Sequence, residues 1–560
     1  MSLRTALLAM VALPGVALAQ TTAITPDVGG ALGLGTTAIQ SGKIVTIDGG
    51  TLAGGNLFHS FTQFSLGAGD TAMWVRSGGG AAGITNVINR VTGGQVSQIA
   101  GTLDSTAFPN AGFFFINPAG IVFGAGAQVN VPAAAYFSTA GELRFAGGDR
   151  FAVATPNGST LSMAAPESFG FVGGQGAITV NGVGPGFAPA QAARSLIASD
   201  VTLDAAQIAL GGLDLAAVGT GQGVVALADP LAAADVGSLT VRNSLIAVTP
   251  GAAVVSGLRL GGGVIVLDGA NLASFTDTAL RGGDIRIAAG QLRFINGSIA
   301  GASTRSVGAG GDVVIRAGAF QGENSSLYTL TATDGRAGRL SLSADSIDLT
   351  GVTLSSNASG SGRGGDITVQ ANALTADSAY LITQSYGTGS GGDIAINAPQ
   401  MKLGGSLAFA GSSASGTPGN VVLRGDLISL NGGSYGSSPG LGSPSGNLTV
   451  TADTSLEAFG TFFAAVAATD NSVGTISISS PRIYFSQVFL NSESDGAGAA
   501  GVLSIQGKSL TLDRSQIHAV SKGVFVRQLG LVQLTGTDDL LINNSLLDST
   551  SEGQAQGGTI

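Results

Sequence analysis

The two histidines are the side chains of this chain best suited to acid–base or metal chemistry, because imidazole titrates near neutral pH and binds metal ions. They are His59 and His518, and the chain has no cysteine. Neither histidine has a second histidine or a cysteine at the spacing of a zinc site. Composition alone leaves a Ser-His-Asp arrangement open, but we predict no catalytic residue, no metal site and no cofactor. For His59 we predict a role in packing or hydrogen bonding.

A row of acidic and amide side chains could instead bind calcium. Each member directly follows one of a series of recurring glycines, and the members are Asp284, Asp312, Asp366, Asp393, Asn420 and Asn447. Calcium takes oxygen ligands of this kind, yet the Gly-Gly-x-Gly-x-Asp pattern of calcium-binding β-rolls is absent. We therefore favour Asx turns that cap the corners of strands, with calcium binding as the alternative.

Arg424-Gly425-Asp426 is a tripeptide that integrins can bind. It lies five to seven residues after Gly419, one of the recurring glycines, and falls between the first and second strands expected in its repeat. A position at a corner of the repeat is compatible with this spacing. Gly-Asp pairs belong to the repeat itself, so the sequence leaves the role of the tripeptide undetermined.

The sparse charge limits the classes of substrate. Only 10% of the residues are charged, and the net charge is −10. Nucleic-acid binding needs clustered lysine and arginine, so the composition argues against that partner. Polysaccharide lyases and hydrolases with a β-helical fold use clustered charges on one exposed strand face. We expect no such clustering of acidic with basic residues from repeat to repeat, and we keep this kind of enzyme as an alternative function.

The elements that carry these residues are set by a repeat in the second half of the chain. Eleven glycines, called marker glycines below, recur every 27 to 29 residues: Gly283, Gly311, Gly338, Gly365, Gly392, Gly419, Gly446, Gly474, Gly501, Gly530 and Gly558. An aliphatic residue follows each one at +2, and another follows the first ten at +4. This period of 2 is typical of a strand, so one structural unit recurs about ten times.

Further apolar residues complete the unit. They lie near +9 (Leu292, Phe320, Ile347, Leu374, Met401, Ile428) and at +16 (Ile299, Leu327, Leu354, Leu381, Tyr435, Phe462, Leu490, Ile517, Leu546). We predict two or three short strands per repeat, joined by tight corners. A unit this small buries its apolar face only by stacking on its neighbours. The fold class predicted is all-β, a parallel β-solenoid with coils of about 27 residues.

The two ends of the chain carry different signals. Residues 1–19 combine a basic Arg4, an apolar stretch and a small-residue ending at Ala19, which is the pattern of a signal peptide cleaved before Gln20. No uncharged apolar run approaches the ~18 residues of a membrane span. The last residues repeat the pattern of an opening strand, so we expect the natural protein to continue beyond residue 560.

Two segments stand out in the less regular region before the repeats. One is Gly55-Asn56-Leu57-Phe58-His59-Ser60-Phe61-Thr62-Gln63-Phe64, and the other is Phe113-Phe114-Phe115-Ile116-Asn117-Pro118-Ala119-Gly120-Ile121-Val122-Phe123-Gly124. Residues 86–94 lie between them, and the segment Ala165-Pro166-Glu167-Ser168-Phe169-Gly170-Phe171 comes later. In this order they resemble the secretion domain of the filamentous-haemagglutinin family, the exoproteins of two-partner secretion.

The resemblance covers the chain to about residue 270, with one departure: Ala119 stands where the common motif has asparagine. It implies export to the periplasm and recognition by an outer-membrane β-barrel with periplasmic docking domains. It also implies that the chain crosses unfolded and folds outside as a right-handed parallel β-helix. Candidate residues for transporter recognition are Asn56, Phe58, His59, Phe61, Phe64, Asn117, Pro118, Gly120 and Ile121.

Structural roles compete with recognition at these positions. Asn-Pro initiates turns and glycine closes them, so Asn117-Pro118-Ala119-Gly120 is first a turn, a role compatible with recognition. The spacing of Phe58, Phe61 and Phe64 favours packing in a core or cap over a binding face.

We therefore expect a signal peptide (1–19), a two-partner-secretion domain that caps the solenoid (20–270) and a β-helical shaft (271–560). The function expected is a secreted or surface-displayed adhesin-like exoprotein, not an enzyme. Its partners would be the outer-membrane transporter and glycans or proteins of a host or neighbouring cell, with no membrane span in the mature chain. A toxin carried on the shaft is a further alternative.

Overall fold

The computed structural model describes residues 21–29, 33–80, 82–182, 192–233, 236–249, 251, 257–413, 416–438, 445–467, 473–494, 501–522, 530–550 and 558–560. In these residues the chain is all-β, and its helical elements are two short 3₁₀ turns, η2 (Pro156–Gly158) and η3 (Pro230–Ala233). None of the helical segments described is long and apolar enough to cross a membrane.

The strands of the described residues form four sheets, of which the longest has 26 strands. Its amino-terminal half contains β1 (Ala23–Pro26), β4 (Thr51–Ala53), β5 (Asn56–Ser65), β7 (Asn86–Val91), β8 (Ser97–Ile99), β10 (Gly112–Ile116), β11 (Ile121–Phe123), β13 (Ala135–Ser138), β17 (Ile178–Asn181), β18 (Ala193–Ala198), β19 (Val201–Asp204), β21 (Gly212–Ala217) and β23 (Ser238–Arg242). Its carboxyl-terminal half contains β25 (Leu258–Asp268), β27 (Ile285–Ile295), β29 (Val313–Glu323), β31 (Leu340–Thr350), β33 (Ile367–Asp377), β35 (Ile394–Asn397), β36 (Gln400–Gly404), β38 (Val421–Asn431), β40 (Leu448–Phe459), β42 (Ile476–Ser479), β43 (Arg482–Ser486), β45 (Val502–Asp513) and β47 (Leu531–Asn543).

A second long sheet faces the shaft half of the first. It contains β20 (Gln207–Leu210), β24 (Leu245–Val248), β26 (Asn271–Thr276), β28 (Ile299–Thr304), β30 (Ser326–Thr331), β32 (Thr353–Ala358), β34 (Tyr380–Ser385), β37 (Leu407–Ser412), β39 (Ser434–Ser438), β41 (Phe462–Ala467), β44 (Phe489–Ser494), β46 (Gln516–Ser521) and β48 (Leu546–Asp548). Two smaller sheets belong to the amino-terminal region. One has β2 (Thr36–Ser41), β3 (Ile44–Gly49), β6 (Thr71–Trp74), β9 (Thr102–Asp104) and β12 (Gln128–Asn130), and the other has β14 (Glu142–Phe145), β15 (Arg150–Ala152), β16 (Pro166–Val172) and β22 (Gln222–Ala226).

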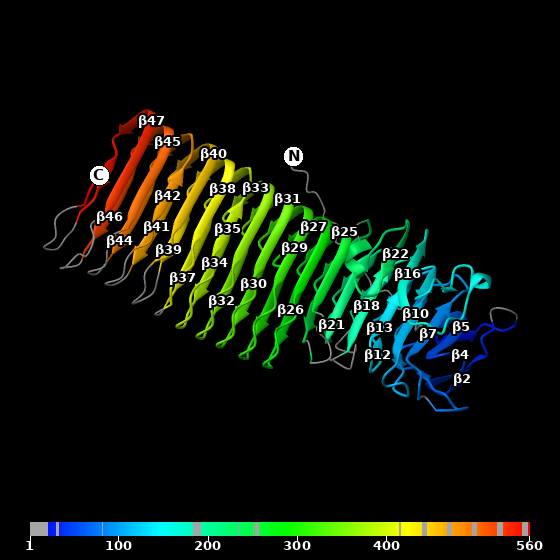
Figure 1. Cartoon of the computed structure of the whole chain (residues 1–560). Helices are drawn as coiled ribbons and strands as arrows, with labels where there is room; N and C mark the ends of the chain where they lie inside the picture. Colours follow the sequence, from blue (N-terminus) through cyan, green and yellow to red (C-terminus); the bar gives the residue numbers. More distant parts are fainter. Residues whose placement is uncertain are drawn as a thin grey trace, which may run out of the picture.

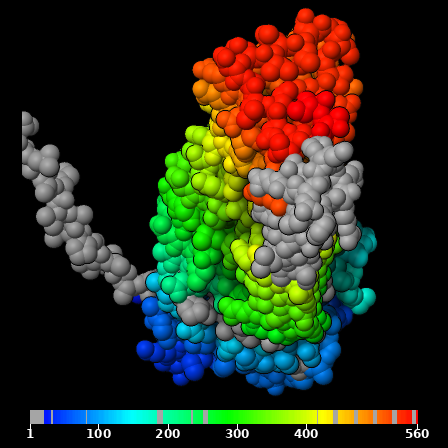
Figure 2. Space-filling model, turned by 90° about the vertical axis from the view of Figure 1, so that its left-hand side faces the viewer, coloured from blue at the N-terminus to red at the C-terminus, as the bar shows by residue number. Residues whose placement is uncertain are grey.

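The strands stack along one axis and make an elongated rod. Figure 1 shows β2 at one end and β47 at the other, and the colours follow the same order in the view of Figure 2. Equivalent strands of consecutive coils pair in parallel, as β29 does with β27 on one side and β31 on the other. The predicted parallel β-solenoid is therefore confirmed.

The first strand of each coil is longer than the sequence suggested. β29 begins two residues after Gly311 and runs for 11 residues, so it contains both the +2 and the +9 apolar positions. The two short strands expected there are one continuous strand. The strand is divided where a proline stands at +7, because proline has no backbone N–H to donate: Pro399 lies between β35 and β36, and Pro481 lies between β42 and β43.

The second strand of each coil carries the +16 position. Leu327, Leu354, Leu381, Tyr435, Leu490 and Ile517 are buried there, but Ile299, Phe462 and Leu546 are not. In the coil of Ile299 the next residue, Ala300, pairs with Leu327 and takes the inward place. The three exceptions fall in repeats of 28 residues. Since side chains alternate along a strand, one added residue moves the neighbouring side chain inward.

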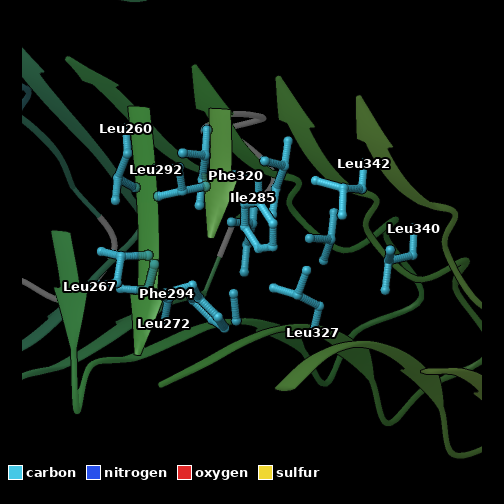
Figure 3. Close-up of a cluster of buried hydrophobic side chains, with 14 of the residues drawn as sticks. Leu260, Leu267, Leu272, Ile285, Leu292, Phe294, Phe320, Leu327, Leu340 and Leu342 are labelled. Atoms are coloured by element: carbon cyan, nitrogen blue, oxygen red, sulfur yellow. The ribbon is translucent and has the colours of Figure 1, made fainter. Parts of the chain in front are cut away.

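The core lies between the two long sheets (Figure 3). Leu292 and Phe294 of β27 extend inward together with Leu327 of the opposite sheet, and all three are at most 1% exposed. Burial of a side chain of this size contributes roughly 1.5–3 kcal/mol. Each coil adds several such side chains, so the shaft is stabilised coil by coil.

Close stacking explains why the marker residue is glycine. A Cβ atom built on Gly338 would lie 1.8 Å from the carbonyl oxygen of Gly311, the marker of the preceding coil. Gly365 stands in the same relation to Gly338, also at 1.8 Å, and Gly392 to Gly365 at 1.9 Å. Any side chain there would push the coils apart, so the repeat is a steric requirement of stacking.

The amino-terminal region adds two layers to the solenoid. The five-stranded sheet encloses the amino-terminal part of the core described above, which is called the first core below. The antiparallel four-stranded sheet, called the covering sheet below, lies over the outer face of the long sheet. The side chains between these two sheets form a second core. At the far end, β5 pairs antiparallel with β1 and β4. These strands end the parallel stack, so the amino-terminal region caps the solenoid.

Candidate functional site

The two segments that stood out in the sequence, and residues 86–94 between them, are neighbours in the structure. β5 carries the first segment, β7 carries residues 86–91 and β10 carries the start of the second segment, and they pair in parallel in that order. Asn56 lies opposite Asn86, and His59 lies opposite Asn89, which in turn lies opposite Phe115. Segments 30 and 26 residues apart in the chain therefore form one continuous patch of sheet.

Asn56 connects this patch to the segment that leads into β16 of the covering sheet. Its amide nitrogen donates to the carbonyl oxygens of Ser162 (2.9 Å) and Ala164 (2.7 Å), and its side-chain oxygen accepts from the amide of Asn86 at 2.8 Å. Asn56 is 1% exposed. An amide is suited to this position because it donates and accepts at once.

His59 is fully buried. Its Nδ1 lies 3.3 Å from the hydroxyl of Thr36, while its Nε2 has no hydrogen-bond partner. Burial lowers the pKa of His59 to about 3, with Arg76 acting in the same direction and Asp48 against it. The imidazole is therefore neutral at physiological pH, and its observed contacts are those of a packed, hydrogen-bonded side chain.

The three phenylalanines of β5 do not share one face. Phe58 packs in the second core against Phe151, with ring centroids 4.9 Å apart. Phe61 and Phe64 both lie in the first core and contact each other edge to face at 5.3 Å. The pairing of β5 with β1 shifts register between them, and this bulge returns Phe64 to the face of Phe61. Packing, rather than a binding face, describes all three.

Asn117-Pro118-Ala119-Gly120 forms a tight turn between β10 and β11. The amide of Gly120 donates to the carbonyl of Asn117 at 3.1 Å, and the side-chain oxygen of Asn117 accepts from the amide of Ala119 at 3.0 Å. The Asn117 amide also donates to Gln95 O (2.8 Å) and Ser97 Oγ (2.9 Å), and the residue is fully buried. Gly120 has φ +126°, a conformation that disfavours residues with a Cβ. After the turn, Ile121 is fully buried in the first core.

A buried charge network beside these residues was missed by the sequence analysis. Arg90 is fully buried and donates from Nε to the hydroxyl of Ser60 (2.7 Å) and from Nη1 to the carbonyl of Ala152 (2.7 Å). The Ser60 hydroxyl donates in turn to Asp27 at 2.5 Å. Burial lowers the pKa of Arg90 to about 10, and Asp27 opposes that shift. The signal was available: Asn89 and Arg90 are adjacent polar residues in a strand whose neighbouring residues, Val87, Ile88 and Val91, are apolar.

Most candidate recognition residues are therefore inaccessible in the folded chain. Along β5 the exposed positions are Thr62 and Gln63, which are not among the candidates. Pro118 is partly exposed at its turn. The later segment that contributed to the resemblance is β16 of the covering sheet, where Phe169 is buried in the second core. The predicted cleavage site, Ala19 and Gln20, lies outside the described residues.

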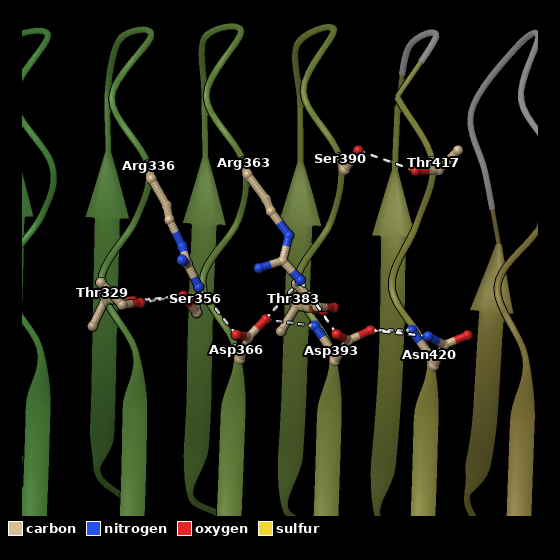
Figure 4. Close-up of polar contacts among 12 residues, drawn as sticks. Thr329, Arg336, Ser356, Arg363, Asp366, Thr383, Ser390, Asp393, Thr417 and Asn420 are labelled. Atoms are coloured by element: carbon tan, nitrogen blue, oxygen red, sulfur yellow. Dashed lines mark hydrogen bonds and ion pairs between the residues drawn. The ribbon is translucent and has the colours of Figure 1, made fainter.

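The acidic row of the shaft forms a ladder from coil to coil (Figure 4). The carboxylate of Asp366 accepts from the backbone amide of Asp393 (3.1 Å), and the carboxylate of Asp393 accepts from the amide of Asn420 (2.7 Å). The same bond joins Asp284 to Asp312 at 2.9 Å. The prediction of Asx turns was wrong in this respect, because each side chain caps the next coil instead of its own corner.

Arginines complete this ladder. Arg363 bridges Asp366 (2.9 Å) and Asp393 (3.3 Å), and Arg336 contacts Asp366 at 3.1 Å. The expectation that acidic and basic residues would not cluster between repeats was therefore wrong. It failed because residues about 30 positions apart become neighbours when coils stack. No group of three or more potential metal ligands occurs in the described part of the chain.

Arg424-Gly425-Asp426 lies within β38, where the pairing with β40 shifts register between Gly425 and Leu427. Arg424 and Asp426 are exposed, and Gly425 is buried between them. The position between two strands expected from the sequence is therefore wrong, because β38 runs through the tripeptide. A tripeptide held in a central strand belongs to the sheet surface, where it lines a groove described below.

In comparison with known proteins, the chain matches one family model and aligns with a solved structure. The family model of the TPS secretion domain matches residues 29–315. No curated protein sequence matches the chain significantly. The crystal structure of the HMW1 secretion domain from Haemophilus influenzae aligns over 83% of this chain and 100% of its own, with 15% sequence identity and a TM-score of 0.35.

Proposed function

This chain belongs to the family of two-partner-secretion (TPS) exoproteins, and from that membership we propose that an outer-membrane transporter exports it and that its shaft serves adhesion or display outside the cell. The observation that carries the proposal is the family match over residues 29–315. The repeats continue beyond that match, and the TPS domain itself is a secretion domain with no catalytic role of its own.

Burial supports recognition before folding. The amide of Asn56 and the ring of His59 are enclosed in the folded protein, so a transporter reaches them only on the unfolded chain. We propose that they and the other candidates, Phe58, Phe61, Phe64, Asn117, Pro118, Gly120 and Ile121, are bound while extended. After transit the same side chains would build the cap on which the first coil stacks.

Folding outside the cell gives a direction to transport. Each coil that forms buries apolar side chains against the previous one, which lowers the free energy of the exported chain. A chain that folds this way does not slide back, so export requires no nucleotide hydrolysis. In this proposal residues 1–19 are the signal peptide, 20–270 the secretion domain and 271–560 the shaft.

Secretion of the full chain from a Gram-negative host, with and without its partner transporter, tests the proposal. We expect the protein in the medium only when the transporter is present. The control is a chain that lacks residues 20–270 but keeps the signal peptide, which should remain in the periplasm in both hosts. Appearance in the medium without the transporter would contradict the proposal.

The alternative of a polysaccharide-acting enzyme is favoured by one observation. Arginine and aspartate side chains gather in a groove on the outside of the shaft, as the catalytic groups of β-helical enzymes do. Shortening of a purified glycan by the secreted protein would establish that alternative.

A further inference from the structure

A polar groove of about 540 Å³ crosses the outside of the shaft from β29 to β40. Its floor consists of small residues at +6 from the marker glycines: Ala317, Ala344, Ala371, Ala398 and Gly425. On either side the chain presents longer side chains at +5 and +7, because neighbours of an inward residue point outward in a strand. The groove therefore runs along the axis of the rod and crosses the strands.

The first wall, at +5, presents mainly hydrogen-bond donors and amides. It consists of Arg316, Ser343, Gln370, Asn397 and Arg424, one from each coil. Each lies in register with the next, as Ser343 does with Gln370 and Asn397 with Arg424. The coils therefore offer one polar side chain per step.

The second wall, at +7, presents mainly acceptors. It consists of Asp345, Asn372, Pro399, Asp426 and Asp453. Among these, the amide of Asn372 donates to Asp345 at 3.2 Å. The two walls together place a donor-rich edge opposite an acceptor-rich edge along the same channel.

Apart from the hydrogen bond between Asn372 and Asp345, the described groove side chains lack the mutual contacts seen elsewhere on the shaft. In the described part of the chain, Gln370, Asn397, Arg424 and Asp426 form no side-chain hydrogen bond or ion pair with other residues. The acidic ladder built on Asp366, by contrast, is paired from coil to coil. Polar groups that the fold does not use are available to a ligand.

The spacing of these groups selects the class of ligand. Coils rise about 4.8 Å per step, so a matching ligand is a chain that repeats polar groups at a similar interval. Sugar hydroxyls both donate and accept, as the two walls require. We propose that the groove binds a linear, uncharged oligosaccharide lying along the axis of the shaft. This names a ligand for the exoprotein proposed above and so rests on that function.

Two other ligand classes fit the groove less well. A peptide strand needs a free sheet edge for its backbone groups, yet the floor strands are paired on both sides, as β33 is with β31 and with β35. A polyanion would meet three aspartates, Asp345, Asp426 and Asp453, against two arginines. Among the described residues that line the groove there is no aromatic ring, so binding depends on hydrogen bonds and should strengthen with glycan length.

Calorimetric titration of the purified full-length mature protein tests this assignment. The probes are short linear fragments of glucans, mannan, xylan and chitin, with heparan sulfate as the charged comparison. We expect at least one uncharged glycan to bind, and the double variant Gln370→Ala/Asn397→Ala to weaken its affinity at least tenfold. The matched control is Gln291→Ala/Arg293→Ala, which removes exposed side chains from β27 outside the groove and should leave affinity unchanged.

Absence of binding by every uncharged glycan, or equal affinity in both double variants, would overturn the proposal, as would preferential binding of heparan sulfate in the groove. Circular dichroism of each variant shows whether it folds. Asp426→Asn is a second variant, which changes one exposed side chain of the groove. Binding by a protein that reaches the medium without a transporter would refute the proposed export while leaving the glycan site standing. Cleavage of the bound glycan would support the ligand assignment and favour the enzyme.

Discussion

At the scale of single residues, the amino-terminal cap depends on buried polar side chains that hydrogen-bond to the backbone of other segments. Asn56 and Asn117 each satisfy backbone groups from separate segments, and Arg90 holds the covering sheet through Ala152. Leaving a buried polar partner unsatisfied costs about 1–3 kcal/mol. The residues that the family resemblance singled out are thus structural, whatever further role they have during export.

His59 makes the stability of the cap depend on pH. Its pKa is about 3 in the folded chain against 6.5 when exposed, so the unfolded state binds the additional proton between these values. Its contribution to stability is present above pH 6.5 and is lost as pH falls, by about 1.4 kcal/mol per pH unit. In His59→Gln we expect the unfolding free energy to fall less steeply between pH 6 and pH 4, by roughly that slope.

Trp74 provides the measurement, because it is the one tryptophan of the chain and is buried in the cap. Urea titrations followed by its fluorescence at several pH values give the slope for each variant. Thr36→Val is the control, since it removes the hydroxyl near Nδ1 but keeps the imidazole. If wild type and His59→Gln showed the same pH slope, the buried neutral histidine would be refuted.

At the scale of elements, two features hold neighbouring coils together, one steric and one based on hydrogen bonds. The marker glycines allow carbonyl oxygens of adjacent coils to approach, and the acidic ladder caps backbone amides across the same corner. Both of these features act between neighbouring coils. A coil is therefore stable only beside a neighbour.

Replacing a marker glycine should destabilise the shaft. A Cβ on Gly365 would lie 1.8 Å from Gly338 O and 2.4 Å from Ser356 Oγ, so Gly365→Ala should cost about 1–3 kcal/mol or more. Gly223→Ala is the matched control, because nothing lies within 4 Å of its added Cβ. Thermal unfolding followed by circular dichroism compares them, and equal melting temperatures would contradict the steric account.

At the scale of the whole molecule, the rod is a one-dimensional stack in which each coil contacts its neighbours. Pairing runs from β25 to β47 in the first sheet and from β20 to β48 in the second. Stability of such an array is approximately a sum of coil and interface terms. The cap closes one end, and the groove spans several coils, so its length is a property of the stack rather than of any strand.

Removal of one complete coil should be tolerated. Excision of residues 339–365 joins Gly338 to Asp366 and keeps the marker pattern, so the shortened protein should fold and melt within a few degrees of the full chain. Excision of residues 353–365 removes β32 with its following turn and leaves half a coil, which should prevent stacking. Circular dichroism and protease resistance distinguish them, and equal resistance of the two deletions would argue against independent coils.

The sequence alone determined the solenoid, its coil length and the inward rows at +2, +4 and +9. These follow from local alternation and a regular interval, which the chain displays directly. It also identified Asn56 to Phe64 and Asn117 to Ile121 as parts of the cap through family resemblance. Burial of His59 and the turn at Asn117 agreed with the structural roles predicted for them.

Tertiary structure decided which distant residues meet. A single added residue per coil replaces Ile299 by Ala300 at the core, and stacking joins Arg363 to Asp393 across 30 positions. Arg90 reaches Ala152 from a separate layer, and the groove exists only when coils lie in register. Such contacts depend on how whole coils stack on one another. A local pattern in the sequence does not specify which side chains of two stacked coils will meet.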